Sequence, residues 1–179
     1  HSTMDHDRDE YLSNIWMADL EGEINQLTFR GGSNRYPRWS PNGKKILFTS
    51  TLSAEGGSSS QLFTIPVLGG EAEQLTNIEG GARSPRWSPD GTQILFISSF
   101  REEEPRSDVK VIKGLKYKFN GAGFIEGRKD HVFIVPSNGG KARQLTQGDF
   151  DVAAAEWLMD GERIAFISNV DGDADLTTD

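Results

Sequence analysis

The sequence predicts an all-β protein: a partial β-propeller of about three four-stranded antiparallel blades, with one long insertion between strands. A motif of Gln-Leu-Thr, then Trp, then a short apolar run ending in Phe occurs three times, with Trp at 39, 87 and 157. In every copy the Trp lies 11 positions after the Thr and the Phe lies 9 positions after the Trp. Constant internal spacing marks a repeated structural unit. No segment shows a sustained helical period, so the repeated unit is interpreted as β.

Each copy is expected to supply four short strands. The first is rich in β-branched and aromatic residues and ends at a glycine turn (14–18, 61–65 and 131–135). The second leads into Gln-Leu-Thr, and the third ends at the Trp. A tight turn, Ser-Pro-Asn-Gly or Ser-Pro-Asp-Gly, then leads into the apolar fourth strand. The third copy has Leu158-Met159 in place of Ser-Pro, so we expect a slightly different hairpin there.

The whole chain, 1–179, is interpreted as one β-propeller portion. Its predicted blades are 12–60, 61–130 with an insertion at 101–130, and an incomplete blade at 131–179. Because a closed ring needs more blades, we expect a larger polypeptide. The other option is that several such arcs associate as a homo-oligomer.

Fixed spacing within repeats is a packing signal, so the repeated residues are expected to be structural. The tryptophans should pack between neighbouring blades, and the phenylalanines at 48, 96 and 166 should lie in the core. The threonines at 28, 76 and 146 should satisfy backbone groups at strand ends.

Composition excludes several classes of function. The 179 residues carry a net charge of −8, which argues against non-specific nucleic-acid binding. Cysteine is absent, and no apolar run is long enough to cross a membrane. The three histidines are scattered, and the acidic alternations at 5–9 and 171–175 do not complete a calcium loop. No metal or cofactor is therefore expected.

The insertion is the main candidate for function. Residues 105–131 hold seven basic groups against three acidic ones, in a chain that is otherwise acidic. We expect Lys116, Tyr117, Lys118 and Phe119 to line the mouth of the propeller or an interface with a catalytic domain. The alternative is a blade extension that packs only on its own neighbour.

The blade motif resembles the repeats of TolB-like proteins and of the prolyl oligopeptidase family of serine peptidases. The insertion distinguishes between these two groups of proteins. Its segment 108–124, followed by 127–133, is similar to the same stretch in acylaminoacyl-peptidase-like members of that family, and 5–11 is similar to the family's first-blade hairpin. The resemblance covers nearly the whole chain.

The resemblance implies the N-terminal propeller of a cytoplasmic serine peptidase of acylaminoacyl-peptidase or dipeptidyl-peptidase type. Such a propeller gates access of short peptides to a C-terminal α/β-hydrolase domain. This chain contains no Gly-x-Ser-x-Gly nucleophile elbow, so no catalytic residue is assigned to it and the enzymatic activity is expected of the larger protein. The alternative is a non-enzymatic, periplasmic TolB-like propeller that binds protein partners.

Overall fold

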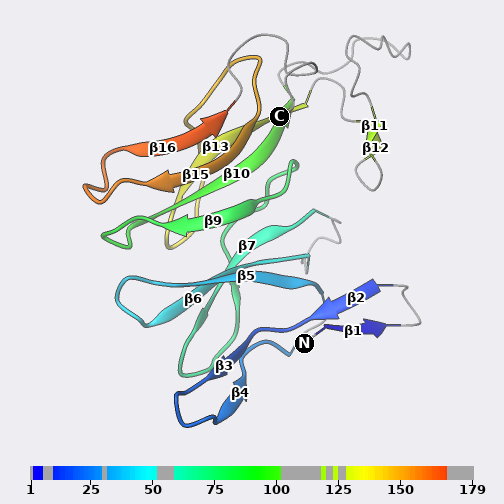
Figure 1. Ribbon diagram of the computed structural model, residues 1–179, viewed down its shortest axis with the longest axis vertical. Helices are drawn as coiled ribbons and strands as arrows, with labels where there is room; N and C mark the ends of the chain where they lie inside the picture. Colours follow the sequence, from blue (N-terminus) through cyan, green and yellow to red (C-terminus); the bar gives the residue numbers. More distant parts are fainter. Residues whose placement is uncertain are drawn as a thin grey trace.

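The computed structural model describes residues 2–5, 10–29, 32–51, 59–101, 118–119, 123–124 and 128–168. Within these ranges every regular element is a β-strand (Figure 1). The strands are β1 Ser2–Asp5, β2 Glu10–Ser13, β3 Trp16–Ala18, β4 Ile24–Gln26, β5 Asn34–Trp39, β6 Lys45–Ser50, β7 Gln61–Pro66, β8 Glu73–Gln74, β9 Arg83–Trp87, β10 Gln93–Arg101, β11 Lys118–Phe119, β12 Gly123–Phe124, β13 Arg128–Pro136, β14 Arg143–Gln144, β15 Val152–Trp157 and β16 Ile164–Ser168.

Two four-stranded antiparallel sheets form the centre of the molecule. The first sheet has the order β5-β6-β7-β8, and the second sheet has the order β9-β10-β13-β14. Four two-stranded sheets accompany them, namely β1-β2, β3-β4, β11-β12 and β15-β16. The prediction of an all-β fold with four-stranded antiparallel blades is thus confirmed.

The sheets are offset from the sequence repeat by two strands. Each complete sheet takes its first two strands from one repeat and its last two from the next. Three repeats therefore give two complete sheets and two half-sheets, β3-β4 and β15-β16, in the described part of the chain. The predicted division at 60/61 passes between β6 and β7, which are hydrogen-bonded neighbours. The spacing of the repeat identifies the strands. Which strands pair in one sheet depends on contacts between hairpins, and the spacing does not encode those contacts.

The sheets are arranged radially. Strand β9 lies against both β5 and β15, so the first strands of successive sheets are neighbours. The strands at the opposite edges, β8 and β14, make no contact with each other. Figure 1 shows β5, β9 and β15 following one another through the stack. We call these three the inner strands; their common edge is where a propeller places its central channel.

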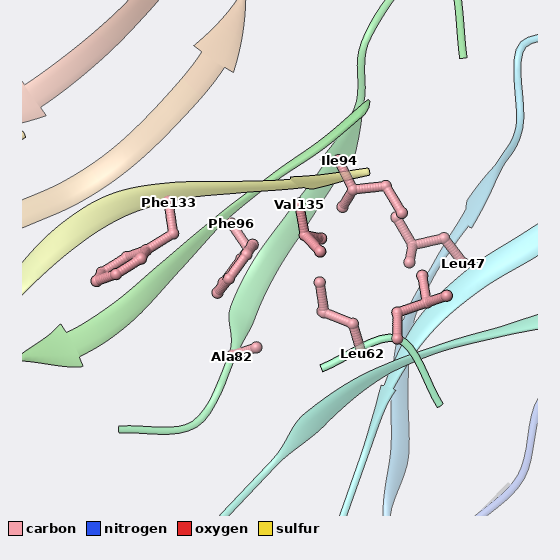
Figure 2. Packing of buried hydrophobic residues seen from close by; sticks show 8 residues of the cluster. Leu47, Leu62, Ala82, Ile94, Phe96, Phe133 and Val135 are labelled. Carbon is pink, nitrogen blue, oxygen red and sulfur yellow. The ribbon is translucent and has the colours of Figure 1, made fainter. Parts of the chain in front are cut away.

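Apolar side chains fill the spaces between sheets. Alternate residues of the apolar runs face opposite neighbours: Leu47 packs toward the second sheet, whereas Ile46 and Phe48 pack toward β3-β4. Figure 2 shows the cluster between the two complete sheets, where Leu47 and Leu62 meet residues of the second sheet. Burial on both faces explains why these runs are continuously hydrophobic.

The core prediction is correct for Phe48 and Phe96, which are 1% and 0% exposed, but wrong for Phe166, which is 42% exposed. The first two each stack on a phenylalanine of the neighbouring strand, Phe63 and Phe133, with ring centroids 5.8 and 5.7 Å apart. Strand β16, which carries Phe166, pairs only with β15 among the described residues, so no strand covers its other side.

The tryptophan prediction holds for two positions out of three. Trp87 packs into the cluster between the two complete sheets, and Trp157 packs into the next cluster along the stack. Trp39, in contrast, is 55% exposed. The half-sheet on its side, β3-β4, lacks the two strands that would cover it in the described part of the chain.

The threonine prediction is confirmed at all three positions. Each Thr Oγ1 accepts the backbone N–H of a residue in the neighbouring strand, namely Ile15, Leu62 and Val132, at 2.9 Å. The glutamine two positions earlier donates to the carbonyl of the same threonine, at 2.7 to 2.8 Å. This threonine clip closes the end of every outer hairpin.

The expected change in the third turn is not found. Leu158 N donates to Arg163 O at 2.8 Å and Gly161 N to Leu158 O at 3.0 Å, and the first two turns contain the same pair of bonds. Gly161 has φ of 70°, close to the values in those turns. Proline only presets a φ that other residues also adopt, so Asp160-Gly161 is enough to form the turn.

Candidate functional site: the base of the insertion and the inner strands

The residues predicted to form the site lie mostly outside the described structure. Lys116 and Tyr117 are not among the described residues. Lys118 and Phe119 form β11, which pairs with β12 in the register Lys118↔Phe124 and Phe119↔Gly123. Their role at a mouth or an interface stays a prediction.

The described structure defines where the insertion begins and ends. Strands β10 and β13 are nine residues long, whereas β6 and β7 of the first sheet have six. The last three pairs of the longer hairpin are Ser99↔Asp130, Phe100↔Lys129 and Arg101↔Arg128. The insertion, predicted at 101–130, thus shares its outermost residues with these strands.

Charged side chains tie the end of this hairpin to both flanking connections. Arg128 pairs with Glu79, between β8 and β9, at 2.9 Å. Lys129 pairs with Asp149 at 3.1 Å and with Asp151 at 3.7 Å, both between β14 and β15. The connections before and after the second sheet are therefore held to the same short segment. We call Arg128, Lys129 and Asp130 the insertion base.

Asp130 is the most enclosed member of the insertion base. Its carboxylate forms an ion pair with Arg83 on β9 and accepts a hydrogen bond from Ser99 Oγ at 2.6 Å. Its backbone N–H donates to Asp151 Oδ1 at 2.8 Å. Since its side chain is only 29% exposed, it bridges three elements at a partly desolvated point.

A glycine permits the close approach of the preceding connection. A Cβ at Gly80 would lie 1.7 Å from Ser99 O and 2.9 Å from Ser98 Oγ. The backbone of the connection therefore runs directly against the end of β10, where Ser99 meets Asp130. Only glycine fits this contact.

The inner strands carry a second group of polar residues. The residue before each repeat tryptophan is Arg38, Arg86 or Glu156, and we call these three the inner row. Arg86 Nε pairs with Glu156 Oε2 at 2.6 Å, which links β9 to β15. Trp87 Nε1 donates to Arg38 O at 3.3 Å, which links β9 to β5.

The inner strands are also irregular. The pairing of β5 with β6 shifts register between Arg35 and Arg38, and β9 and β15 contain similar shifts. Tyr36 and Ser84, at equivalent positions three before the tryptophan, have φ of 56° and 52°. A positive φ is unusual for a residue other than glycine, and bulges of this kind redirect side chains.

A hollow of about 480 Å³ lies between the first two Pro-Asn/Asp-Gly turns, and Pro41, Trp87 and Asp90 contribute to its lining. Ser88 Oγ donates to Asp90 at 2.6 Å, and the Thr92 hydroxyl and backbone N–H donate as well. These hydrogen bonds lower the pKa of Asp90 from 3.8 to about 2, and the bond from Ser88 has the largest effect. Asp90 is therefore a charged turn residue and unsuited to proton transfer near neutral pH.

Among the described residues no group of three or more His, Asp or Glu side chains is arranged to hold a metal ion. A helix able to cross a membrane is likewise not found in those ranges. The insertion base and the inner row were both missed by the sequence interpretation. The signal for the inner row was present, because superposing the three repeats on their tryptophans aligns Arg38, Arg86 and Glu156.

The chain is similar in sequence to a known protein and in fold to several solved structures. The chain matches no protein-family model. It is 31% identical over 180 residues to an uncharacterized peptidase, YuxL, of Bacillus subtilis, a match that covers 94% of this chain and 27% of that protein. The chain thus spans about a quarter of the length of this relative.

Solved structures share the fold at low sequence identity. Acylaminoacyl peptidase of Pyrococcus horikoshii superposes with a TM-score of 0.63 at 18% identity, covering 86% of this chain and 23% of that one. TolB of Acinetobacter baumannii gives 0.57 at 20% identity, with 87% and 33% coverage. The β-propeller domain of the Trilobed protease of Pyrococcus furiosus gives 0.51 at 15%, with 86% and 40% coverage. The chain therefore has a β-propeller fold, and the predicted resemblance to the propeller region of acylaminoacyl-peptidase-like proteins is confirmed.

Proposed function

We propose that this chain is the N-terminal propeller portion of a cytoplasmic serine peptidase of acylaminoacyl-peptidase or dipeptidyl-peptidase type. In this proposal the propeller gates the access of short peptides to a C-terminal α/β-hydrolase domain that lies outside this chain. The observation that carries it is the 31% identity, over 94% of this chain, to a protein described as a peptidase. Most of that protein lies beyond the matched segment, which leaves room for a catalytic domain.

In the proposed reaction the propeller restricts which substrates reach the catalytic domain and supplies no catalytic group. This chain holds no nucleophile elbow, so the serine, its base and the oxyanion donors would all come from the hydrolase domain. The inner strands would form part of the wall of a channel whose width limits the size of the substrate. A folded protein is excluded sterically, whereas an extended peptide can pass.

The insertion base supports a gating role for the insertion. A long loop joined to the sheet by a free hairpin would sample many orientations. Here Arg128 and Lys129 hold the end of the hairpin to the connections on both sides. These pairs are exposed, so each contributes at most about 1 kcal/mol, but together they favour one orientation of the insertion base. From this base the insertion would extend over the channel or against the catalytic domain.

The test uses the polypeptide encoded by the complete reading frame. We expect it to react with a fluorophosphonate probe for serine hydrolases and to cleave short peptides but not casein. Replacing residues 104–125 with a four-residue Gly/Ser turn should leave the probe reaction intact and change the longest peptide that is cleaved. The matched control replaces residues 52–58, which follow the equivalent hairpin end of the first sheet, with a shorter Gly/Ser segment.

Two results contradict the proposal. Absence of any reaction with the probe overturns the peptidase assignment. An unchanged substrate-length limit after shortening the insertion overturns its gating role and leaves the peptidase assignment standing.

A second candidate is a non-enzymatic, periplasmic propeller that binds protein partners, as expected of TolB-like proteins. The superposition on TolB of Acinetobacter baumannii at a TM-score of 0.57 favours it. The complete reading frame distinguishes the two candidates. A downstream Gly-x-Ser-x-Gly followed by Asp and His supports the peptidase, whereas a signal peptide without a hydrolase domain supports the binding protein.

A further inference from the structure

One arginine of the inner row, Arg38, has no acidic partner among the described residues. Arg86 has Glu156 on the next inner strand, at 2.6 Å. Arg38 occupies the equivalent position one repeat earlier, and its Nη1 donates to Pro37 O at 3.0 Å, as Arg86 Nη1 does to Pro85 O at 2.9 Å. In the part of the chain that the structure describes, no ion pair includes Arg38.

The repeat explains why this partner is missing. The neighbour on the next inner strand is a glutamate for Arg86 but another arginine, Arg86 itself, for Arg38. Strands β5 and β9 are in contact, and the Trp87 Nε1 bond to Arg38 O fixes their relative position. The inner row thus holds two guanidinium groups and one carboxylate, in a chain whose net charge is −8. Like charges on adjacent strands repel, so an anion would be stabilised beside them.

The bulge of β5 places an aromatic side chain on the strand that carries Arg38. Tyr36 has φ of 56° and is 52% exposed at the register shift of β5. Ser84 has φ of 52° at the equivalent position of β9, so the bulge is a feature of the repeated inner strand. The bulge leaves the phenol exposed on the strand that carries Arg38.

We propose that Arg38, on the inner edge of the first sheet, binds the carboxylate of a short peptide that occupies the channel. The proposal rests on the gating function given above and deepens it, because it specifies the free C-terminal carboxylate as the group that the propeller recognises. A guanidinium offers two parallel N–H donors that match the two oxygens of a carboxylate. Arg38 is partly exposed, and its acidic counterpart is supplied by the ligand.

The experiment compares a peptide that has a free carboxylate with its carboxamide. Acetyl-tetraalanine and acetyl-tetraalanine amide differ in one group and are assayed with the complete polypeptide. We expect the wild-type protein to have a KM about tenfold lower for the free acid, because a charge-assisted bond contributes about 1.5 kcal/mol. Arg38→Gln should raise this KM to that of the amide, with kcat and the KM for the amide unchanged.

Two further variants keep the interpretation specific. Arg38→Lys should retain part of the preference, since a lysine preserves the charge but not the bidentate geometry. Lys141→Gln is the matched control, because it removes one positive charge from an exposed residue outside the inner row and should leave the preference intact. The thermal midpoint of each variant shows whether it is folded. If Arg38→Gln does not fold, Arg38→Lys is used in its place.

An equal preference for the free acid in Arg38→Gln and in wild-type protein overturns the proposed site. If the polypeptide has no peptidase activity, the gating function fails, but the site is still tested by titration calorimetry with the same two peptides. Tighter binding of the free acid, lost in Arg38→Gln, then supports the site. Equal binding of both peptides, or binding of neither, contradicts it.

Discussion

The first and second sheets have the same strand order and the same threonine clip, but the hairpin between their second and third strands differs in length. In the first sheet this hairpin ends at the pair Ser50↔Gln61. In the second sheet it continues for three more pairs, to Arg101↔Arg128. The buried clusters involve the same repeat positions in both sheets. An insertion at this end of the hairpin therefore leaves the core unchanged.

The additional pairs carry charge in place of apolar residues. Beyond the last core residues the second sheet places Asp130, Lys129 and Arg128, and each of them contacts a flanking connection, Asp130 through its backbone N–H. Strands β10 and β13 thus continue beyond the buried core and form the base of the insertion. The second sheet therefore keeps the packing of the first, and the residues at the base of its insertion form ion pairs with the neighbouring connections.

The largest predicted effect concerns Gly80, which lies beside the end of the longer hairpin. Gly80→Ala places a Cβ 1.7 Å from Ser99 O, a backbone atom that cannot move without distorting β10. We expect a loss of about 2–4 kcal/mol in the free energy of unfolding, measured by urea denaturation of the full chain. The control, Gly22→Ala, meets no atom within 4 Å and should cost about 1 kcal/mol through its φ of 96°. Equal losses in the two variants would contradict the steric explanation.

The next effect tests whether the clip contributes equally in both sheets. Thr76→Val and Thr146→Val each remove the acceptor for a buried backbone N–H, of Leu62 and Val132 respectively. We expect each to lower the free energy of unfolding by about 1–3 kcal/mol, because that N–H is left without a partner. Urea denaturation of the two variants side by side measures the difference.

The matched control is Thr64, a threonine in the same sheet whose buried hydroxyl has no hydrogen-bond partner in the described structure. The second sheet has Ile134 at the equivalent position. Thr64→Val removes a hydroxyl that is buried without compensation, so it should be neutral or stabilising. A loss as large as that of Thr76→Val would show that the clip is not the origin of the effect.

A smaller effect is expected at the insertion base. Asp130→Asn weakens the contacts with Arg83 and Ser99, which are partly exposed, so we expect global stability to fall by at most about 1 kcal/mol. Local opening should increase by up to about fivefold, measured as faster trypsin cleavage within 102–127. Ser60→Ala, at the equivalent position of the first sheet, is the control. Unchanged cleavage in Asp130→Asn would indicate that the base does not restrain the insertion.

The sequence was sufficient to identify the local features and insufficient for the pairing. Spacing located the strands, the turns and the role of Thr28, Thr76 and Thr146, because each depends on residues close in sequence. It did not show that a sheet combines two repeats, since that choice depends on contacts between hairpins. Phe166 was misassigned for the same reason, because its exposure depends on a neighbouring strand and not on its own position.

The candidate site was predicted in outline only. Charge and length singled out the insertion, but Arg128 and Asp130 are recognised as its base only once Glu79 and Arg83 are seen beside them. That Arg38 lacks an acidic partner within the described ranges is likewise a property of three adjacent strands. Residues that act through contacts between repeats are invisible to spacing within a repeat.

The smallest effect distinguishes the turns of the two sheets by pH. Asp90, in the second sheet, has its pKa lowered to about 2 from an ordinary 3.8, whereas the first sheet has the uncharged Asn42 at that position. A lowered folded-state pKa stabilises the protein above pH 3.8, and this contribution is lost as the pH falls from 3.8 to 2. Asp90→Asn should therefore be slightly less stable than wild type at pH 7, and the two should converge near pH 2. Urea denaturation at pH 7, 4 and 2.5 measures this difference. If it is the same at all three pH values, the carboxylate contributes nothing through its charge, and the turns of the two sheets are equivalent.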